Sequence, residues 1–491
     1  MLTRRHLRHE VTTGRTRTRV ADVALIMTAH LDLPISLIAV AIISEAAVRD
    51  ALGVEEDPRS VFDYSNPHMP SLHVAGVQLP PPGGATSQVP EVGGRLALFA
   101  HQWGLIGADD WVTSVVSQGY RLEFTDSPPA TTQVRETPLP VAGPKRDALL
   151  GELQSLLLKK AVYPIQEEHL LPGFAAIFFL APKKSGDWRP IINLRPLNAY
   201  IKAKHFRMET LSVVLRSPIK HSWTTSIDLR DAYLHIPIHH LDHKWLRFKI
   251  LGQAYAFRCL PFGLSTAPRV FTRVVMNVAA FLRRQGVRIH MYLDDWLISA
   301  PSFQLAVQHT QFVLHTARTL GFIVNLDKSH LHPTQQPLFL GAQLDLVLGR
   351  VTPSPERVER LRTSVQSLFH SLSATAFVWL QVLGFMASMV DVVPWCRLRM
   401  RPLQLHLNCF YKPTIHSLSQ LVPVSDVVRE ELLWWMQVQN LLIGAEFPMK
   451  TPQVTLTTDA SSLGWGGIWA PMWRAVYGPV NRGHSTSMYW N

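Results

Sequence analysis

Two stretches of the chain repeat apolar residues at the spacing of an α-helix. One covers residues 145–161 and the other residues 354–370, and in each the repeat places the apolar side chains on one face. Ser354 suits the N-cap of the second stretch, and Pro355 suits its first turn. We therefore predict two amphipathic helices. Their apolar positions are Leu149, Leu153, Leu156 and Leu157 in the first helix and Val358, Leu361, Val365 and Leu368 in the second.

The pattern elsewhere favours strands mixed with helices. Residues 175–180 and 188–194 are predicted to be strands, because they are largely apolar and the sequence PKKSGD between them suits a turn. Residues 371–445 are rich in Leu and Trp and are predicted to be mostly helical, whereas residues after 451 are β-like. We therefore expect an α+β fold.

Proline and glycine indicate the domain boundaries. Residues 79–94 are Pro/Gly-rich with little capacity to pack, and residues 127–144 hold five prolines. A segment with Trp103 and Trp111 lies between them and is expected to pack. The expected divisions are 1–78, an N-terminal region of unknown role and poor order; 79–144, a Pro/Gly-rich linker region with a short packed segment; 145–345, the main α+β body; 346–445, a mainly helical part; and 451–491, a β segment.

The composition favours a polyanionic partner such as nucleic acid. The 491 residues carry 48 Lys and Arg against 36 Asp and Glu, a formal net charge of +12, and 47% of them are hydrophobic, enough for a large core. A generic basic surface gives the same charge, so the charge alone leaves both interpretations open. The three cysteines form no CxxC pair, which argues against a disulfide framework and fits an intracellular compartment, cytoplasmic or nuclear.

The apolar runs are short of a membrane span. The stretch from Leu33 to Ile43 has 11 residues and contains Pro34, whereas a spanning helix needs about 20. Because this run follows an arginine-rich start, a targeting signal fits the region, but the late start of the run favours a poorly structured arm. We expect no membrane partner.

The sequence SIDLRDAYLHIPI, residues 226–238, contains the first group suited to catalysis. The apolar approach through Trp223 and Ile227 predicts a strand that ends at Asp228. A carboxylate at the end of a buried strand is held rigidly, as a metal ligand must be. An aspartate that caps a helix fits the same position, so this segment alone leaves the two interpretations open.

The sequence HMYLDDWLIS, residues 290–299, places two adjacent aspartates between apolar residues. This pattern predicts a hairpin with Asp294 and Asp295 at its turn, although two aspartates at a turn are also ordinary on a surface. Two negative charges in apolar surroundings repel each other and lose hydration, so a cation such as Mg²⁺ is expected to compensate. The enclosing residues are Met291, Tyr292, Leu293, Trp296, Leu297 and Ile298.

Three carboxylates from two strands can hold two metal ions roughly 3.5–4 Å apart. One ion of such a site activates an attacking hydroxyl, and the other stabilises a triphosphate and its leaving pyrophosphate. Asp228, Asp294 and Asp295 are therefore the predicted catalytic and metal-binding residues, with two Mg²⁺ ions or with Mn²⁺ in their place.

The order and spacing of these motifs resemble those of the reverse transcriptases, over about residues 146–345. Asp228 matches the first catalytic aspartate of that family, and YLDD, residues 292–295, matches its signature hairpin. The resemblance implies a right-hand polymerase fold with fingers, palm and thumb, acting on a primer, an RNA or DNA template and deoxynucleoside triphosphates. The phrases DLRDAYLHIPI, LPFGLSTAPRVFT and YLDDWLI resemble retrotransposons of the DIRS type. That subtype implies a tyrosine recombinase and a capsid-like protein as further partners.

The resemblance also implies nucleotide-binding roles. KKSGDWRP, residues 183–190, resembles the fingers hairpin, in which Lys183 or Lys184 and Arg189 contact the triphosphate; a solvated basic turn is the alternative. Tyr233 matches the steric gate against a ribose 2′-hydroxyl, and its alternative is a packed core tyrosine.

Three later motifs complete the resemblance. In LPFGLSTAP, Gly263 allows a close approach of backbone to nucleotide, and Phe262 replaces the glutamine of retroviral enzymes, which puts a hydrogen bond there in doubt. In GFIVNLDKS, Lys328 matches a residue that protonates pyrophosphate, with a surface lysine as the alternative. FLGAQLD resembles the primer grip, around Leu340 and Gly341.

Residues 454–467, VTLTTDASSLGWGG, resemble the first strand and turn of a ribonuclease H domain. Asp459 matches the first metal-binding carboxylate of that domain, and no Asp or Glu follows it in the remaining 32 residues. We therefore expect a truncated ribonuclease H-like segment without ribonuclease H activity.

These observations predict an RNA-directed DNA polymerase of a retrotransposon. A domesticated or fragmentary nucleic-acid-binding protein without catalysis is the main alternative, and the presence of all three aspartates argues against it. An RNA-dependent RNA polymerase would share the palm but build RNA, and Tyr233 argues against that class. A structural protein has no use for buried paired aspartates.

Overall fold

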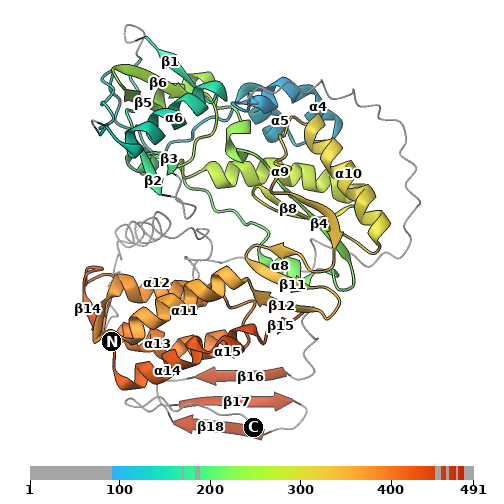
Figure 1. Cartoon of the computed structure of the whole chain (residues 1–491), viewed down its shortest axis with the longest axis vertical. Helices are drawn as coiled ribbons and strands as arrows, with labels where there is room; N and C mark the ends of the chain where they lie inside the picture. Colours follow the sequence, from blue (N-terminus) through green and yellow to red (C-terminus); the bar gives the residue numbers. More distant parts are fainter. Residues whose placement is uncertain are drawn as a thin grey trace, which may run out of the picture. The chain divides into compact units, whose positions relative to one another are not determined.

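The computed structural model describes residues 91–140, 142–166, 171–182, 188–447, 455–460, 464–470 and 474–479. The chain divides into two compact units, one of residues 65–337 and the other of residues 1–64 with 338–491, and each is described here by itself (Figure 1). None of the helices in the described ranges is both long and apolar enough to cross a membrane.

A four-stranded antiparallel sheet with the order β7-β8-β4-β9 lies at the centre of the first unit. Helix α9 packs against β7, and helix α10 packs against β8, β4 and β9 (Figure 1). The hydroxyl of Thr225 on β4 bonds to the hydroxyl of Thr310 on α10. Because side chains alternate along a strand, Ser226 and Asp228 point to the opposite face of the sheet. The bounds are Trp223–Asp228 for β4, Arg288–Tyr292 for β7, Asp295–Ala300 for β8, His330–Thr334 for β9, Ala267–Arg284 for α9 and Phe303–Thr319 for α10.

Two smaller sheets belong to the same unit. One has the order β1-β6-β5, and the other is the hairpin of β2 and β3, which confirms the two strands predicted on either side of PKKSGD. Helix α6 packs against β1, β2 and β3 and confirms the first predicted helix. It ends before Lys160, whose φ of 53° lies outside the helical region. The bounds are Pro144–Leu158 for α6, Val162–Ile165 for β1, Phe178–Pro182 for β2, Trp188–Ile192 for β3, Arg247–Ile250 for β5 and Gln253–Phe257 for β6.

Short helices connect these sheets. Helix η4 follows β4 directly and carries Tyr233, so the end of the strand and the predicted gate are close in the chain. The bounds are Arg195–Asn198 for α7, Leu211–Arg216 for α8, Ala232–His235 for η4 and His240–Trp245 for η5.

The segment before the second proline-rich stretch is part of this unit's core. Helices η2 (Arg95–Phe99), α4 (Ala100–Leu105) and α5 (Asp110–Gln118) precede it. Leu96 and Trp103 are completely buried and belong to the same hydrophobic cluster as residues of β4 and α9. The packed body therefore includes residues from Val92 onward, on the N-terminal side of the proline-rich stretch, because proline content reports local propensity and not long-range contact.

The second unit combines helices α11 to α15 with a four-stranded sheet of order β10-β11-β12-β15 and a pair of short strands, β13 and β14. Helix α11 confirms the second predicted helix: the Ser354 hydroxyl accepts a hydrogen bond from the Arg357 N–H, and Pro355 is the first helical residue. The helix bounds are Pro355–Phe369 for α11, Ala376–Ala387 for α12, Cys396–Phe410 for α13, Asp426–Met436 for α14 and Val438–Leu442 for α15. The strand bounds are Leu338–Phe339, Ala342–Asp345, Arg350–Pro353 and Ala445–Glu446 for β10, β11, β12 and β15, and Ser373–Thr375 and Leu421–Pro423 for β13 and β14.

The last three strands that the structure describes form an antiparallel meander of β16 (Thr455–Ala460), β17 (Gly464–Ala470) and β18 (Arg474–Pro479). Asp459 lies in β16 opposite Gly466. The β character predicted for this region is therefore confirmed.

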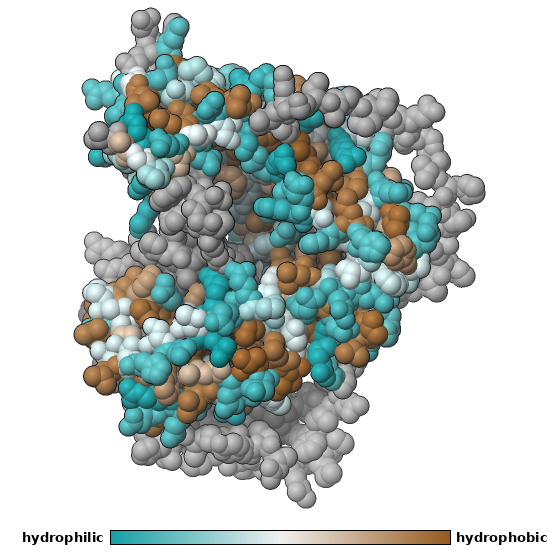
Figure 2. All heavy atoms as spheres, viewed as in Figure 1, coloured by the Kyte–Doolittle hydropathy of each residue, from teal (hydrophilic) through white to brown (hydrophobic). Residues whose placement is uncertain are grey.

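Apolar side chains remain visible among polar ones on the face drawn in Figure 2. The exposed large apolar residues of the second unit include Leu372, Trp395 and Ile415. A folded protein always leaves part of its apolar surface in water, so exposure of single residues needs no special explanation.

Candidate active site

The hairpin of β7 and β8 presents the two adjacent aspartates. Tyr292 pairs with Asp295, so Leu293 and Asp294 form a two-residue turn, and Asp295, predicted to lie at the turn, is instead the first residue of β8. Leu293 has a φ of 54°, a conformation that costs energy for a residue with a side chain. The buried indole of Trp296 donates a hydrogen bond to the Leu293 carbonyl at 3.1 Å, which holds the turn in this shape. The aromatic residue after the aspartates therefore has a structural reason to be there.

Asp228 is the last residue of β4 and lies opposite Asp295 in the register. Residues paired in this way have Cα atoms about 4.5–5.5 Å apart and side chains on one face. The Asp228 carbonyl accepts a hydrogen bond from the Asn325 N–H at 2.8 Å, and its own N–H donates to the Ser329 hydroxyl at 3.0 Å. The capping alternative fails here, because the N-cap of the following helix η4 is Asp231.

The three carboxyl groups share a field that disfavours negative charge. Burial raises the pKa of Asp228, and the charge of Lys328 and a hydrogen bond from Asn325 oppose part of that rise. Burial and the negative charge of Asp228 raise the pKa of Asp294. Local loss of hydration and the charges of Asp294 and Asp228 raise the pKa of Asp295 to about 7, although the residue as a whole is exposed to solvent. A divalent cation would remove this repulsion.

The carboxyl groups do not form a ready-made ligand shell. Among the described residues, no group of three or more His, Cys, Asp or Glu side chains is gathered closely enough to hold a metal ion. Without a cation, the negative charges of these carboxylates repel one another. The metal-ligand set of Asp228, Asp294 and Asp295 stays a prediction, and their backbone register supports it.

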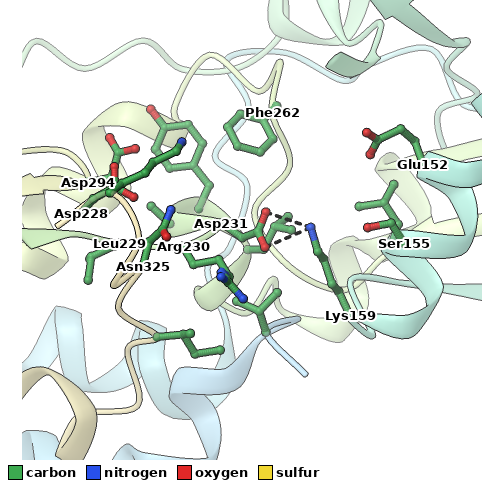
Figure 3. Close-up of a pocket in the computed structure, with 17 residues that line it drawn as sticks. Glu152, Ser155, Lys159, Asp228, Leu229, Arg230, Asp231, Phe262, Asp294 and Asn325 are labelled. Atoms are coloured by element: carbon green, nitrogen blue, oxygen red, sulfur yellow. Dashed lines mark hydrogen bonds and ion pairs between the residues drawn. The ribbon is translucent and has the colours of Figure 1, made fainter. Parts of the chain in front are cut away.

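A cavity of about 640 Å³ opens beside Asp228 and Asp294 (Figure 3). Tyr233 and Phe262 line it with ring centroids 5.2 Å apart. Gly263 has a φ of 101°, and an added Cβ would lie 2.7 Å from the Ile192 carbonyl oxygen, so only glycine fits this turn. The other lining residues are Val92, Glu152, Ser155, Leu156, Lys159, Leu229, Arg230, Asp231, Ala232, Leu234, Ile323, Asn325 and Lys328.

Lys328 lies in the wall of this cavity and is not simply a surface lysine. Its charge lowers the pKa of all three aspartates, against the larger effect of burial. Tyr233 is partly buried and faces the cavity, and burial with the charge of Asp294 raises the pKa of its hydroxyl. The structure therefore brings Tyr233, Phe262 and Lys328 together with Asp228 and Asp294 at this cavity. Asp295 and Gly263 are not among the residues that line it.

Comparisons with known proteins agree with this geometry. Residues 181–344 match the family model described as "Reverse transcriptase (RNA-dependent DNA polymerase)". The matched range contains Asp228, Asp294 and Asp295. The chain contains a reverse transcriptase domain.

Transposon polyproteins carry similar sequences. The "Transposon Tf2-3 polyprotein" of Schizosaccharomyces pombe is 26% identical over 228 residues, which are 46% of this chain and 16% of that protein. The "Retrovirus-related Pol polyprotein from transposon opus" of Drosophila melanogaster is 25% identical over 298 residues, which are 58% of this chain and 28% of that protein. The chain thus spans less than a third of the length of either relative.

Solved reverse transcriptases share the fold. The foamy viral protease-reverse transcriptase in complex with dsDNA has a TM-score of 0.55 at 14% identity and covers 82% of this chain and 83% of its own. The same viral protein in complex with RNA/DNA hybrid has a TM-score of 0.52 at 14% identity and covers 82% of this chain and 54% of its own. The fold expected from the motifs, that of a reverse transcriptase polymerase, is therefore confirmed.

The side chains of four predicted site residues lie outside the part of the chain that the structure describes. Lys183 and Lys184 are outside the described residues, and of Arg189 only the backbone, in β3 opposite Ala181, is described. Asp459 belongs to the second unit, and its side chain is not described. These assignments stay predictions.

The predicted primer grip is a tight turn in the second unit. Leu340 and Gly341 connect β10 and β11 as a two-residue turn with φ values of 48° and 71°. Two positive φ values are typical of the type I′ hairpin turn. The carbonyl of Gly341 accepts hydrogen bonds from the N–H of Ser354 and from the Arg357 side chain. The turn is thus fixed to the start of α11.

Glu209 supports the reverse transcriptase hairpin and was not predicted. Its carboxylate accepts hydrogen bonds from the Met291 N–H at 2.9 Å and from Arg283 at 2.6 Å, and Arg283 also bonds to the Ile289 carbonyl. Burial works to raise the pKa of Glu209, but His290, Arg283 and the Met291 N–H outweigh it and hold that pKa below its usual value. A lone glutamate in a loop gives no sequence signal for this role.

We expect Glu209→Gln to lower the free energy of unfolding by about 2–3 kcal/mol, because Arg283 would keep its largely buried charge without the carboxylate that balances it. Primer extension should also fall, because Met291 precedes the aspartate turn. Urea unfolding measures the first effect. Glu123→Gln is the control, since Glu123 pairs with Lys204 in a more exposed position and should change stability by less than about 0.5 kcal/mol. Equal stability of the two variants would contradict the prediction.

Proposed function

We propose that this chain is the RNA-directed DNA polymerase of a retrotransposon. It extends the 3′-hydroxyl of a primer on an RNA or DNA template with deoxynucleoside triphosphates. The observation that carries the proposal is the placement of Asp228 opposite Asp295, with Asp294 at the adjoining turn and a nucleotide-sized cavity beside them. The transposon relatives and the polymerase fold support it.

Asp228, Asp294 and Asp295 would hold two Mg²⁺ ions, or Mn²⁺ in their place. Their raised pKa values fit this role, since the carboxyl groups need a cation to stay ionised together. When bound, the ions supply positive charge to the primer hydroxyl and to the triphosphate. The aspartates hold and orient that charge, and the hydrogen bonds to the Asp228 backbone keep its position fixed.

The cavity walls would select and orient the nucleotide. Tyr233 would exclude a ribose 2′-hydroxyl, and Phe262 packs against it as part of the same wall. Gly263, which the structure packs against the Ile192 carbonyl, would let the backbone beside Phe262 approach the nucleotide closely. Lys328 would donate a proton to the leaving pyrophosphate.

Other predicted residues would bind the rest of the substrate. Lys183, Lys184 and Arg189 would contact the triphosphate, and Leu340 with Gly341 would contact the primer. The foamy viral enzymes are described in complex with dsDNA and RNA/DNA hybrid, and those complexes support a duplex of primer and template as the partner here.

We further propose that the parent element is of the DIRS type. The sequences DLRDAYLHIPI and YLDDWLI support this subtype, and it would add a tyrosine recombinase and a capsid-like protein as element-encoded partners. The meander β16–β18 would be the start of a ribonuclease H-like domain without activity in this chain, because no acidic residue follows Asp459 in the printed sequence.

Primer extension on an RNA template tests the function. Purified chain should extend a DNA primer with deoxynucleotides and Mg²⁺ and stop when the metal is chelated. Extension with ribonucleotides alone would favour an RNA polymerase, and tight binding of the duplex without extension would favour the non-catalytic alternative. Degradation of the RNA strand of a hybrid would contradict the inactive ribonuclease H-like segment.

Tyr233→Ala tests the gate. Removing the ring should allow ribonucleotides to be incorporated, and we expect the preference for deoxynucleotides to fall by at least about 10²-fold, since a steric exclusion is lost. Single-turnover incorporation of each nucleotide measures this preference. Phe262→Ala is the matched control, because it opens the same wall from the neighbouring ring, which is 42% exposed. If the Tyr233→Ala variant still rejects ribonucleotides, Tyr233 is a packed core residue and not a steric gate.

A further inference from the structure

The cavity has a second wall that the reverse transcriptase family model does not cover. Glu152, Ser155 and Lys159 line it from helix α6 and its C-cap, before the matched residues 181–344. Figure 3 shows Lys159 on the side of the cavity away from Asp228 and Asp294, with Asp231 between them. This wall therefore lies across the cavity from the predicted catalytic residues Asp228 and Asp294. The phosphates of a nucleotide would occupy the space between them.

Lys159 is held with its charge facing this space. Its ammonium lies 3.0 Å from each carboxylate oxygen of Asp231, and both side chains are about four-fifths buried, with 21% and 23% of their surfaces exposed. An ammonium group has three N–H donors. Asp231 accounts for two of them, and the third has no partner in the described part of the chain. Lys159 can thus keep its ion pair and still donate to an anion.

Positive charge is scarce around the cavity. Apart from Lys159, the described cationic side chains in its wall are Arg230, which is 3.9 Å from Asp327, and Lys328, which acts on the three aspartates. Phosphoryl transfer moves negative charge onto the leaving pyrophosphate, and a fixed cation there lowers the energy of that step. Glu152 would repel a phosphate beside it, which confines the anion to the Lys159 end.

We infer that Lys159 binds the β- and γ-phosphates of the incoming nucleotide and the pyrophosphate that leaves. The inference rests on the proposed polymerase function and deepens it, by assigning a phosphate contact to a residue of α6. Asp231 is then a positioning residue: it fixes the ammonium toward the cavity instead of toward solvent.

Inhibition by inorganic pyrophosphate provides the test. In Lys159→Ala, the pyrophosphate concentration that halves primer extension should rise on the order of tenfold, the value of one charge-assisted hydrogen bond. The KM for deoxynucleotide should rise with it, and kcat should change less. Lys159→Arg should restore most of the loss. Lys204→Ala is the control, because Lys204 pairs with Glu123 away from the cavity and should leave all three quantities unchanged.

A structural ion pair would behave differently. If the pair only stabilised the fold, Lys159→Ala and Asp231→Asn would lower the melting temperature alike and leave pyrophosphate inhibition unchanged, which would overturn the inference. Asparagine suits the left-handed backbone at Asp231, so that variant should fold. We expect Asp231→Asn to retain pyrophosphate binding, because the amide oxygen can still accept a hydrogen bond from the Lys159 ammonium and hold it toward the cavity.

Binding without turnover separates this inference from the proposed function. The melting temperature of wild-type chain should rise with Mg²⁺ and inorganic pyrophosphate, and that of Lys159→Ala should rise less. If the wild-type chain extends primers but its melting temperature rises with Mg²⁺ and pyrophosphate by the same amount as that of Lys159→Ala, only the inference is overturned. Wild-type chain that neither extends primers nor responds to pyrophosphate would overturn both.

Discussion

Asp294→Asn is expected to lower primer extension on the order of 10³-fold or more, because it removes one negative charge and one metal-binding oxygen from the catalytic group. The chain should remain folded. Burial and the charge of Asp228 already oppose ionisation of Asp294, so a neutral amide at this position relieves repulsion. The melting temperature without metal should therefore be equal to that of the wild type or higher.

Mg²⁺ distinguishes catalysis from folding in this experiment. Adding Mg²⁺ should raise the melting temperature of the wild type more than that of Asp294→Asn, since a ligand that binds only the folded state stabilises it. Asp327→Asn is the control: it removes the same charge nearby, but the Asp327 side chain is 90% exposed and lies outside the cavity. If wild type and Asp294→Asn extend primers equally, the assignment of this hairpin to the active site is wrong.

Trp103→Ala is expected to lower the free energy of unfolding by about 3–5 kcal/mol, because it leaves a large cavity in the core. Trp103 is completely buried, its indole N–H donates to the Leu320 carbonyl at 3.2 Å, and its ring meets Phe322 edge-on at 5.9 Å. Primer extension should fall as well. The supported segment continues to Asn325, whose N–H bonds to the Asp228 carbonyl.

Urea unfolding of matched variants measures this effect. Leu98→Ala lies in the same segment but is 70% exposed, and it should change stability by less than about 0.5 kcal/mol. Trp103→Phe keeps most of the ring and loses the N–H donor, so it should fold and show an intermediate loss. If Trp103→Ala unfolds like the wild type, residues 91–118 are not part of the polymerase core.

The local elements followed from the sequence wherever neighbouring residues determine them. Helix α11 was predictable because its cap, its first proline and its apolar repeat are all within one stretch. The hairpin was predictable because an apolar strand on each side leaves only a turn between them, but the predicted position of the turn was wrong by one residue: Leu293 and Asp294 form it, and Asp295 begins β8. The resemblance of these motifs to reverse transcriptases came from the same short stretches, and residues 181–344 match the model of that domain.

Contacts between distant segments were not predictable in this way. Glu209 caps the edge of β7 from a loop 82 residues away, and Trp103 supports Leu320 from 217 residues away. Neither residue stands in a periodic pattern, since each contributes one side chain to a partner that the sequence does not indicate. The proline-rich stretch between Trp103 and the main body even suggested a separation that the core does not have.

The sequence by itself determined which carboxylates lie at the ends of strands or in turns. It also determined which motifs accompany them and in what order, and these together indicate metal-dependent nucleotide transfer. The tertiary structure alone decided which further groups surround those carboxylates, including Glu209 behind the hairpin and Lys159 across the cavity. The physical reason is that strand ends and turns depend on the sterics and burial pattern of neighbouring residues. The positions of charged side chains such as Glu209 and Lys159 relative to the site depend instead on how elements far apart in the chain pack together.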